Sequence, residues 1–318
     1  MASRSEPSRS TAPTEMAVSG VAGDGLADAL KRVQGEIDSV FDAFLPVPED
    51  TSARLVEAMR YAAIGGGKRV RPLLVVSTAE MYGVDRDAAL RAGAAIEAIH
   101  VYSLIHDDMP CMDDDDLRHG KPTVHKVYDE ATAVLAGDAL HALAFEILAD
   151  TGTSSDPFVR SELIATLGKA SGMGGMAGGQ MMDMVADEEG DYDLRAITRL
   201  QQLKTGALLA ASVEMGAILG RVPPEGRAHL RAYSRDIGLA FQIADDLLDV
   251  EGDAEKAGKA LRKDEGQGKQ TFVTLMGVDK AREQARALVD QAVAHLGSHG
   301  SEADTLRALA RFIVERDR

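Results

Sequence analysis

The sequence is poor in the residues that stack, cross-link and span membranes. Its 318 residues include no tryptophan and one cysteine, Cys111, and aromatic residues make up only 4 %. Few aromatic rings disfavour a platform on which nucleic-acid bases stack. A single cysteine cannot form a disulfide within the chain, which fits a reducing, cytoplasmic setting. No run approaches the roughly 18 uninterrupted apolar residues of a membrane span, so we expect none.

Positive charge is also in short supply. Lys and Arg number 35 against 51 Asp and Glu, which gives a formal net charge of −16. Nucleic acids and anionic lipid surfaces repel such a chain, so we expect neither as a partner. A ligand that carries phosphate must therefore meet a local group of cations or metal ions.

The chain divides into a short polar start and a long helical remainder. Residues 1–24 are rich in Ser, Thr, Pro, Gly and Ala and lack the apolar block of a signal peptide, which predicts a disordered tail. From Leu26 onward apolar residues recur every three and four positions, as in helices, and period-two alternation is missing. We predict a single all-α domain of ten or more helices over residues 25–318 and no sheet. The predicted helices lie near 26–44, 51–64, 70–82, 87–108, 129–149, 157–172, 193–219, 225–250, 270–293 and 301–315.

Aspartates cluster at the end of the apolar helical stretch AIEAIHVYSLIH. Asp107 and Asp108 come first, and Asp113 opens a run of four. Carboxylates this close raise one another's pKa unless a cation neutralises them, and Mg²⁺ is suited to few carboxylates with water and phosphate. Six residues of continuous helix would turn Asp113 away from Asp107, but Pro110 can end the helix and let Asp113 fold back. Taken alone, the cluster also fits a solvated acidic loop.

A second cluster occurs in FQIADDLLD. Asp245 and Asp249 are four apart, so they project from one helical face, and Asp246 lies beside them. Two such clusters facing each other predict several Mg²⁺ ions held across one cavity. The loop glycine and terminal Glu of an EF-hand are missing after Asp113, so that calcium site is excluded.

Cations occur where a phosphate site would need them. The segment GGGKRVRP places Lys68 and Arg71 at a predicted helix start, where backbone N–H groups also favour an anion, although its spacing is not that of a Walker A loop. Arg118 follows the first Asp cluster, Lys204 lies in a predicted helix, and Lys259 follows the second cluster. This pattern indicates a diphosphate chelated by Mg²⁺ and clamped by Lys and Arg.

Six motifs in order resemble those of the trans-isoprenyl diphosphate synthases, and most of all their bacterial farnesyl diphosphate synthase branch. They are GGGKRVRP, SLIHDDMPCMDDDDLRHGKPTVHK, GMAGGQMMD, LKTGALL, FQIADDLLD and the stretch from GK through KD to GKQT, and the similarity spans nearly all of residues 26–318. The resemblance implies a prenyl synthase fold with a central cavity, usually as a homodimer. It also implies head-to-tail condensation of isopentenyl diphosphate with dimethylallyl or geranyl diphosphate to give farnesyl diphosphate.

The same resemblance implies a role for each matching residue. Three Mg²⁺ ions per site would be bound by Asp107, Asp108, Asp113, Asp245, Asp246 and Asp249. The allylic diphosphate would be held by Arg118, Lys204 and Lys259, and isopentenyl diphosphate by Gly67, Lys68, Arg71, His100 and His119. The oxygens of Thr205 and Gln242 would face the allylic cation. By its spacing alone, His100 could also be an ordinary core histidine.

Two positions carry finer expectations. The family usually has Arg-Arg where this chain has Arg118 and His119, so we expect weaker binding of isopentenyl diphosphate that tightens as the pH falls. Tyr102 and Ser103 precede Asp107 by five and four residues, about 6–7.5 Å along the helix. Tyr102 would close the cavity floor after two condensations, which favours a fifteen-carbon product.

Four other functions fit parts of the pattern. A geranylgeranyl diphosphate synthase would differ only in its cavity floor. A class I terpene cyclase would share the first motif, but FQIADDLLD carries three aspartates where a cyclase has Asn, Ser or Thr, and Glu. A non-catalytic synthase subunit would have lost aspartates that this chain keeps. A generic acidic Ca²⁺-binding protein would leave the cations unexplained.

Overall fold

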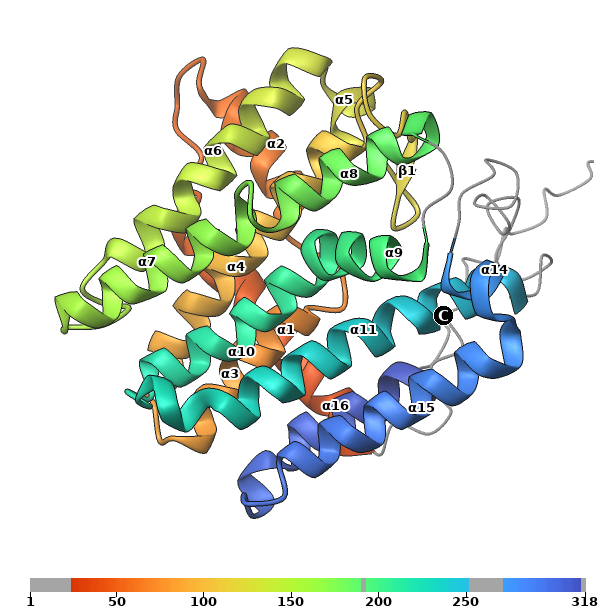
Figure 1. Cartoon of the computed structure of the whole chain (residues 1–318). Helices are drawn as coiled ribbons and strands as arrows, with labels where there is room; N and C mark the ends of the chain where they lie inside the picture. The colour runs from red at the N-terminus through yellow and green to blue at the C-terminus, as the bar shows by residue number, and fades with distance from the viewer. Residues whose placement is uncertain (1–23, 190–192, 252–270, 316–318) are drawn as a thin grey trace, which may run out of the picture.

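The computed structural model describes residues 24–189, 193–251 and 271–315 (Figure 1). The α-helices of these residues are α1 (Asp24–Phe44), α2 (Ala53–Ala63), α3 (Val70–Met81), α4 (Arg86–Asp107), α5 (Val124–Val127), α6 (Glu130–Ala149), α7 (Pro157–Ser171), α8 (Met176–Glu189), α9 (Leu194–Gln201), α10 (Ala207–Leu219), α11 (Ala228–Glu251), α14 (Phe272–Met276), α15 (Val278–His295) and α16 (Asp304–Glu315). A π-helical turn, η1 (Gln202–Gly206), joins α9 to α10, and the 3₁₀ turns η2 (Pro224–Arg227) and η4 (Ser301–Ala303) precede α11 and α16. The all-α prediction is confirmed.

Helix α4 forms the centre of the bundle. Asp85 caps its first turn by accepting hydrogen bonds from the backbone of Asp87 and Ala88. Its middle is rich in alanine, and α1, α3, α6 and α10 pack around it. Because α4 is enclosed in this way, the aspartates at its end emerge directly from the core.

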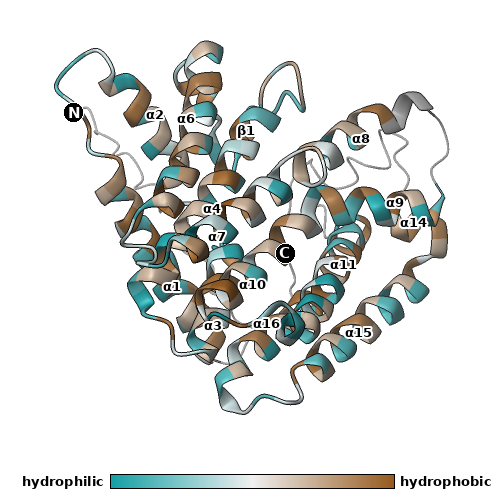
Figure 2. Ribbon diagram, turned by 60° about the vertical axis from the view of Figure 1, so that its left-hand side comes forward, coloured by the Kyte–Doolittle hydropathy of each residue, from teal (hydrophilic) through white to brown (hydrophobic). Residues whose placement is uncertain are grey.

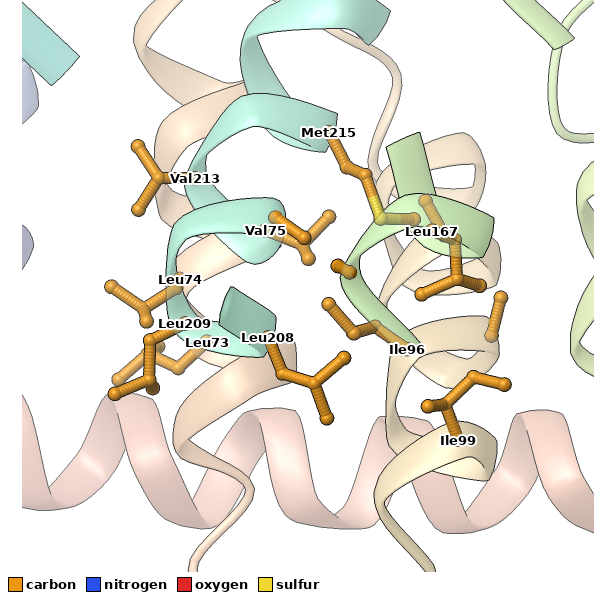
Figure 3. Close-up of a cluster of buried hydrophobic side chains, with 14 of the residues drawn as sticks. Leu73, Leu74, Val75, Ile96, Ile99, Leu167, Leu208, Leu209, Val213 and Met215 are labelled. Atoms are coloured by element: carbon orange, nitrogen blue, oxygen red, sulfur yellow. The ribbon is translucent and has the colours of Figure 1, made fainter. Parts of the chain in front are cut away.

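The core between α3, α4, α7 and α10 is built from aliphatic side chains. Figure 3 shows Leu73, Leu74 and Val75 of α3 beside Ile96 and Ile99 of α4, Leu167 of α7, and Leu208, Leu209, Val213 and Met215 of α10. The approach of α10 to α3 depends on Gly216, where a Cβ would lie 2.6 Å from the carbonyl oxygen of Val75. Only glycine allows the two backbones to come this close.

The outer helices are amphipathic. Hydrophobic and hydrophilic residues alternate along α15 (Figure 2), and Ala281, Ala285 and Leu288 are buried at the three- and four-residue spacing read from the sequence. This buried face packs against α11, which carries the second aspartate cluster.

Two helices, α4 and α6, are long and apolar enough to cross a membrane by length and composition alone. The apolar residues of α4 are accounted for by its place in the core. Helix α6 is less than half buried over its apolar window and exposes Leu135. Its outer face is therefore an apolar surface.

The structure differs from the sequence prediction at four places. The helix expected over 193–219 is divided by the π-turn, and that over 270–293 is divided at Gly277, whose φ is +83°. The glycine run 172–179, taken as a break, contains the start of α8. No sheet was expected, yet β1 (Leu117–Arg118) and β2 (Lys121–Pro122) form a short antiparallel ribbon. Two-residue strands are too short to show an alternating pattern. The predicted tail lies almost wholly outside the described residues.

Candidate active site

A pocket of about 640 Å³ opens beside the end of α4. Its walls come from the loop before α3, the inner face of α4, the β1–β2 ribbon, α10, α11 and α16. Asp108 of the first cluster and Asp245 of the second both line it. The two aspartate clusters, far apart in the sequence, therefore meet at one pocket.

The first aspartate cluster forms a tight turn. Helix α4 ends at Asp107, and the amide of Asp113 donates a hydrogen bond to the carbonyl of Asp107 over 2.8 Å. The chain therefore folds back after Pro110, as the spacing required. The Asp114 amide bonds to the Met109 carbonyl over 3.1 Å and tightens the same turn.

Burial sets the electrostatics of this turn. The pKa of Asp107 is raised to about 6, mainly by desolvation and also by the nearby Asp113 and Asp108 charges, against the opposing effect of Lys204 and Arg118. Desolvation also raises the pKa of Asp108, although Arg118 donates to it from Nε over 2.9 Å. Burial therefore disfavours the charged forms of both carboxylates.

The second cluster separates into two roles. Asp245 faces the pocket, and the Nε2 of Gln242 approaches its Oδ2 at 3.5 Å. Asp246 instead accepts a hydrogen bond of 2.7 Å from the backbone of Phe272 and so fixes the start of α14. Asp245 and Asp249 are one helical turn apart on the same face of α11. One carboxylate oxygen of Asp246 is already occupied by its hydrogen bond to the Phe272 backbone.

The aspartates at the end of α4 and on α11 offer carboxylate oxygens, the ligands that Mg²⁺ prefers. Among the residues that the structure describes, no three Asp, Glu, His or Cys side chains converge closely enough to enclose a metal ion. Magnesium sites in proteins commonly use one or two carboxylates together with water and phosphate oxygens.

Lys204 reaches the site from the π-turn, a feature frequent at functional sites. Its Nζ donates to Asp183 Oδ2 over 2.6 Å. Helix α8 approaches so closely that a Cβ on Gly179 would lie 2.6 Å from the Cα of Lys204. The motif GMAGGQMMD by itself indicated no role for Asp183. Its contact with Lys204 gives Asp183 the role of holding that lysine in place. Thr205 lies on the same π-turn.

The GGGKR loop depends on an internal ion pair. Arg69 has a φ of 52° and is buried, and it donates to Glu97 and to Asp38 over 2.8 Å each and to the carbonyl of Ala63. The sequence reasoning missed Arg69 and Glu97 because their contact joins residues 28 apart. These ion pairs hold the loop in place and neutralise the charge of Arg69.

Arg71 and His100 face the same part of the pocket. The Nε of Arg71 is buried without a hydrogen-bond partner among the described residues. Desolvation lowers the pKa of His100 well below 6.5, and the charges of Arg71 and Arg69 lower it further. The imidazole of His100 is therefore neutral near pH 7, and the unpartnered guanidinium nitrogen indicates an anion site.

His119 occupies the turn of the ribbon. Both turn residues, His119 and Gly120, have positive φ values of 51° and 75°, as a type I′ turn requires. Desolvation and then the charge of Arg118 lower the pKa of His119. Protonation of His119, and any tightening that depends on it, therefore begins at a lower pH than an ordinary histidine would give.

The residues assigned to product length lie beneath Asp107 on α4. The ring of Tyr102 contacts those of His106 and His141, with centroids 5.7 and 5.0 Å apart, and so faces α6. Ser103 donates to the carbonyl of His100 over 2.8 Å. Neither residue lines the pocket described above, so their control of chain length stays a prediction. Gly67, Lys68 and Arg118 do line it, whereas Lys259 lies outside the described residues.

Known proteins resemble this chain over most of its length. The sequence pattern of the family named polyprenyl synthetase matches residues 52–310. The farnesyl diphosphate synthase of Escherichia coli (strain K12) is 45 % identical, over 83 % of this chain and 90 % of its own. The chloroplastic geranylgeranyl pyrophosphate synthase of Catharanthus roseus is 44 % identical, over 83 % of this chain and 74 % of its own. A crystal structure of an FPP/GFPP synthase from Zymomonas mobilis has a TM-score of 0.83 and 60 % identity and covers 91 % of this chain and 99 % of that one.

An all-α bundle that brings carboxylates and cations together at one pocket defines an isoprenoid synthase fold. The chain belongs to the polyprenyl synthetase family and is a prenyltransferase.

Proposed function

We propose that the chain condenses isopentenyl diphosphate head-to-tail with dimethylallyl and then geranyl diphosphate to give (E,E)-farnesyl diphosphate. The observation that carries this proposal is the single pocket lined by Asp108, Asp245 and the GGGKR loop. Such a pocket can take one diphosphate with metal and another with cations alone. The farnesyl diphosphate synthases among the relatives support the fifteen-carbon product.

The aspartate side of the pocket would take the allylic diphosphate. Mg²⁺, which when bound neutralises charge on the departing diphosphate, would be held by Asp107, Asp108, Asp113, Asp245, Asp246 and Asp249. Lys204 and Arg118 add fixed positive charge there, and their present pairs with Asp183 and Asp108 hold them in position. Three metal ions per site belong to this proposal.

The GGGKR side would take isopentenyl diphosphate. Lys68 and the unpartnered nitrogen of Arg71 would bind its diphosphate. Leu209, Phe241 and Phe312 line the pocket with apolar surface that excludes water from the allylic cation. The double bond attacks that cation, and the released diphosphate takes the final proton, so the chain needs no side-chain nucleophile.

A homodimer in the cytoplasm completes the proposal. The apolar outer face of α6, where Leu135 is 56 % and Val134 is 40 % exposed, is suited to a second copy of the chain. Residues 25–318 would act as one synthase domain, since the family match at 52–310 lies inside that range.

A product assay tests the proposed reaction. The protein is incubated with Mg²⁺, isopentenyl diphosphate and dimethylallyl, geranyl or farnesyl diphosphate in turn, and the products are identified by mass. Farnesyl diphosphate as the terminal product is expected, and no condensation with any starter would refute the proposal. Asp107→Asn should lower kcat about 100-fold or more. Asp87→Asn, at the opposite end of α4, is the matched control and should retain activity.

Geranylgeranyl diphosphate synthesis is the second candidate. It is favoured by the geranylgeranyl synthase of Catharanthus roseus among the relatives. Efficient extension of farnesyl diphosphate in the same assay would assign this product instead.

A further inference from the structure

Lys121 is a cation of the pocket that no role in the proposed reaction uses. It lies on β2, directly after the turn that holds His119 and Gly120, and it lines the pocket. A Cβ built on Gly65 would lie 3.9 Å from the Nζ of Lys121. The ammonium group therefore stands beside the glycine turn that leads into Lys68.

The ribbon holds Lys121 in this place. The hydroxyl of Tyr61 on α2 donates to the carbonyl of Pro122 over 2.7 Å. Thr123 is fixed at the other side by bonds from its amide and hydroxyl to the carbonyls of Asp116 and Asp115, over 3.0 and 2.9 Å. Lys121 thus extends from a strand whose next two residues are both held by hydrogen bonds, rather than from a free loop.

The strand register sets two like charges opposite each other. Lys121 pairs directly with Arg118 across the ribbon, so both side chains leave the same face. Directly opposed like charges are destabilising unless anions compensate them. Asp108 and Asp115 accept hydrogen bonds from Arg118, whereas no carboxylate forms an ion pair with Lys121 in the part of the chain that the structure describes. The uncompensated charge points to an anionic ligand.

The neighbouring imidazoles cannot supply this charge. Desolvation and the surrounding arginines lower the pKa of both His100 and His119. Arg69 is already neutralised by Glu97 and Asp38. At neutral pH the positive charge offered to a ligand beside the glycine turn therefore comes from Lys68, Arg71 and the additional Lys121.

We propose that Lys121 is a further binding residue for the metal-free diphosphate in the GGGKR pocket and supplies there the positive charge that His119 lacks. This inference rests on the proposed function in one respect, that the ligand is isopentenyl diphosphate. It assigns the diphosphate a third cation from the ribbon, in addition to Lys68 and Arg71.

The test measures binding of isopentenyl diphosphate alone, by calorimetry in metal-free buffer with EDTA, so that no turnover occurs. Lys121→Gln should weaken binding about tenfold, the value of one charge-assisted hydrogen bond. Lys121→Arg should bind nearly as tightly as the wild type. Lys126→Gln is the matched control, because this nearby lysine is paired with Asp116 over 2.7 Å and does not line the pocket. Its affinity should be unchanged.

Kinetics distinguish this inference from the proposed function. In the condensation assay Lys121→Gln should raise the KM for isopentenyl diphosphate about tenfold and leave the KM for geranyl diphosphate unchanged. Adding His119→Arg to Lys121→Gln should recover most of the loss. If the wild type condenses substrates but Lys121→Gln matches Lys126→Gln, Lys121 has no such role and the proposed function stands. If the wild type binds isopentenyl diphosphate through Lys121 without condensing it, the proposed function fails and the anion site stands.

Discussion

Individual charged residues in this protein are either neutralised inside the fold or left for a ligand. Arg69 belongs to the first kind, since it is 3 % exposed and paired with Glu97 and Asp38. Arg71 belongs to the second, since no carboxylate forms an ion pair with it among the described residues, although the Nε atoms of both arginines lack a partner there. Removing one member of a buried pair leaves an uncompensated charge, which costs several kcal/mol. The sequence GGGKRVRP shows these two arginines as equivalent, but the packing around them makes their roles different.

His119 yields the first prediction at the residue scale. Its pKa is lowered by desolvation and by Arg118, so it carries no charge near pH 7. His119→Arg should lower the KM for isopentenyl diphosphate about tenfold. The ratio of the KM values of the two proteins should stay constant from pH 8 to about 6.5, because His119 takes up its proton only below the ordinary histidine pKa. Steady-state kinetics at several pH values measure this ratio, in which the titration of the substrate cancels. An unchanged KM in the variant would remove His119 from the site.

Tyr102 yields the second prediction at the residue scale. Its ring fills space between α4 and α6 against His141, one to two turns below Asp107. Tyr102→Ala should open this space and shift the main product from fifteen to twenty or more carbons. Product chain lengths are measured by mass spectrometry, with Tyr128→Ala as the control, since Tyr128 packs against Tyr61 instead. A product distribution unchanged in Tyr102→Ala would place the cavity floor elsewhere.

At the scale of elements, the site depends on contacts between helices that are distant in sequence. Helix α8 and the π-turn approach closely enough for Asp183 to hold Lys204. The ribbon is tied to α2 through Tyr61, and α14 is tied to α11 through Asp246. Each of these contacts joins a helix that has no proposed catalytic or binding residue to an element that has one.

Gly179 tests the first of these contacts. Gly179→Ala would place a methyl group 2.6 Å from the Cα of Lys204, so α8 and the π-turn must separate. We expect a loss of 1–3 kcal/mol or more in the free energy of unfolding and a large fall in kcat. The control is Gly35→Ala in α1, where no atom lies within 4 Å of the new methyl group. Alanine should stabilise α1 by roughly 0.5–1 kcal/mol. Chemical denaturation compares the two, and equal stabilities would contradict the close packing.

At the scale of the whole molecule, two aspartate clusters and one basic loop meet because α4 ends at the same pocket that Asp245 of α11 lines. The core around α3, α4 and α10 fixes these helices in place (Figure 3). Five Lys and Arg residues line this pocket, and Val134 and Leu135 are exposed on α6.

That apolar face yields the last prediction. The wild-type protein should sediment as a dimer of about twice 33.8 kDa. Leu135→Glu should shift it towards the monomer, because a charge in an apolar interface is costly to bury. Phe158→Glu is the control, since Phe158 is 84 % exposed but lies on α7, outside the proposed interface. A monomeric wild type, or a Leu135→Glu variant that remains dimeric, would contradict the proposed interface.

The sequence by itself determined the helical class, most helix positions, the two aspartate clusters and the family. These features follow from local sequence: the three- and four-residue periodicity of apolar residues, the break at Pro110, and motifs that can be recognised by their order along the chain. Tertiary structure decided which charges are already neutralised, because Arg69 meets Glu97 and Lys204 meets Asp183 only after packing. It also decided that Asp246 serves α14 and that Lys121 reaches the glycine turn. Such long-range contacts leave no local pattern, and burial, which sets the pKa of Asp107 and His119, exists only in the folded chain.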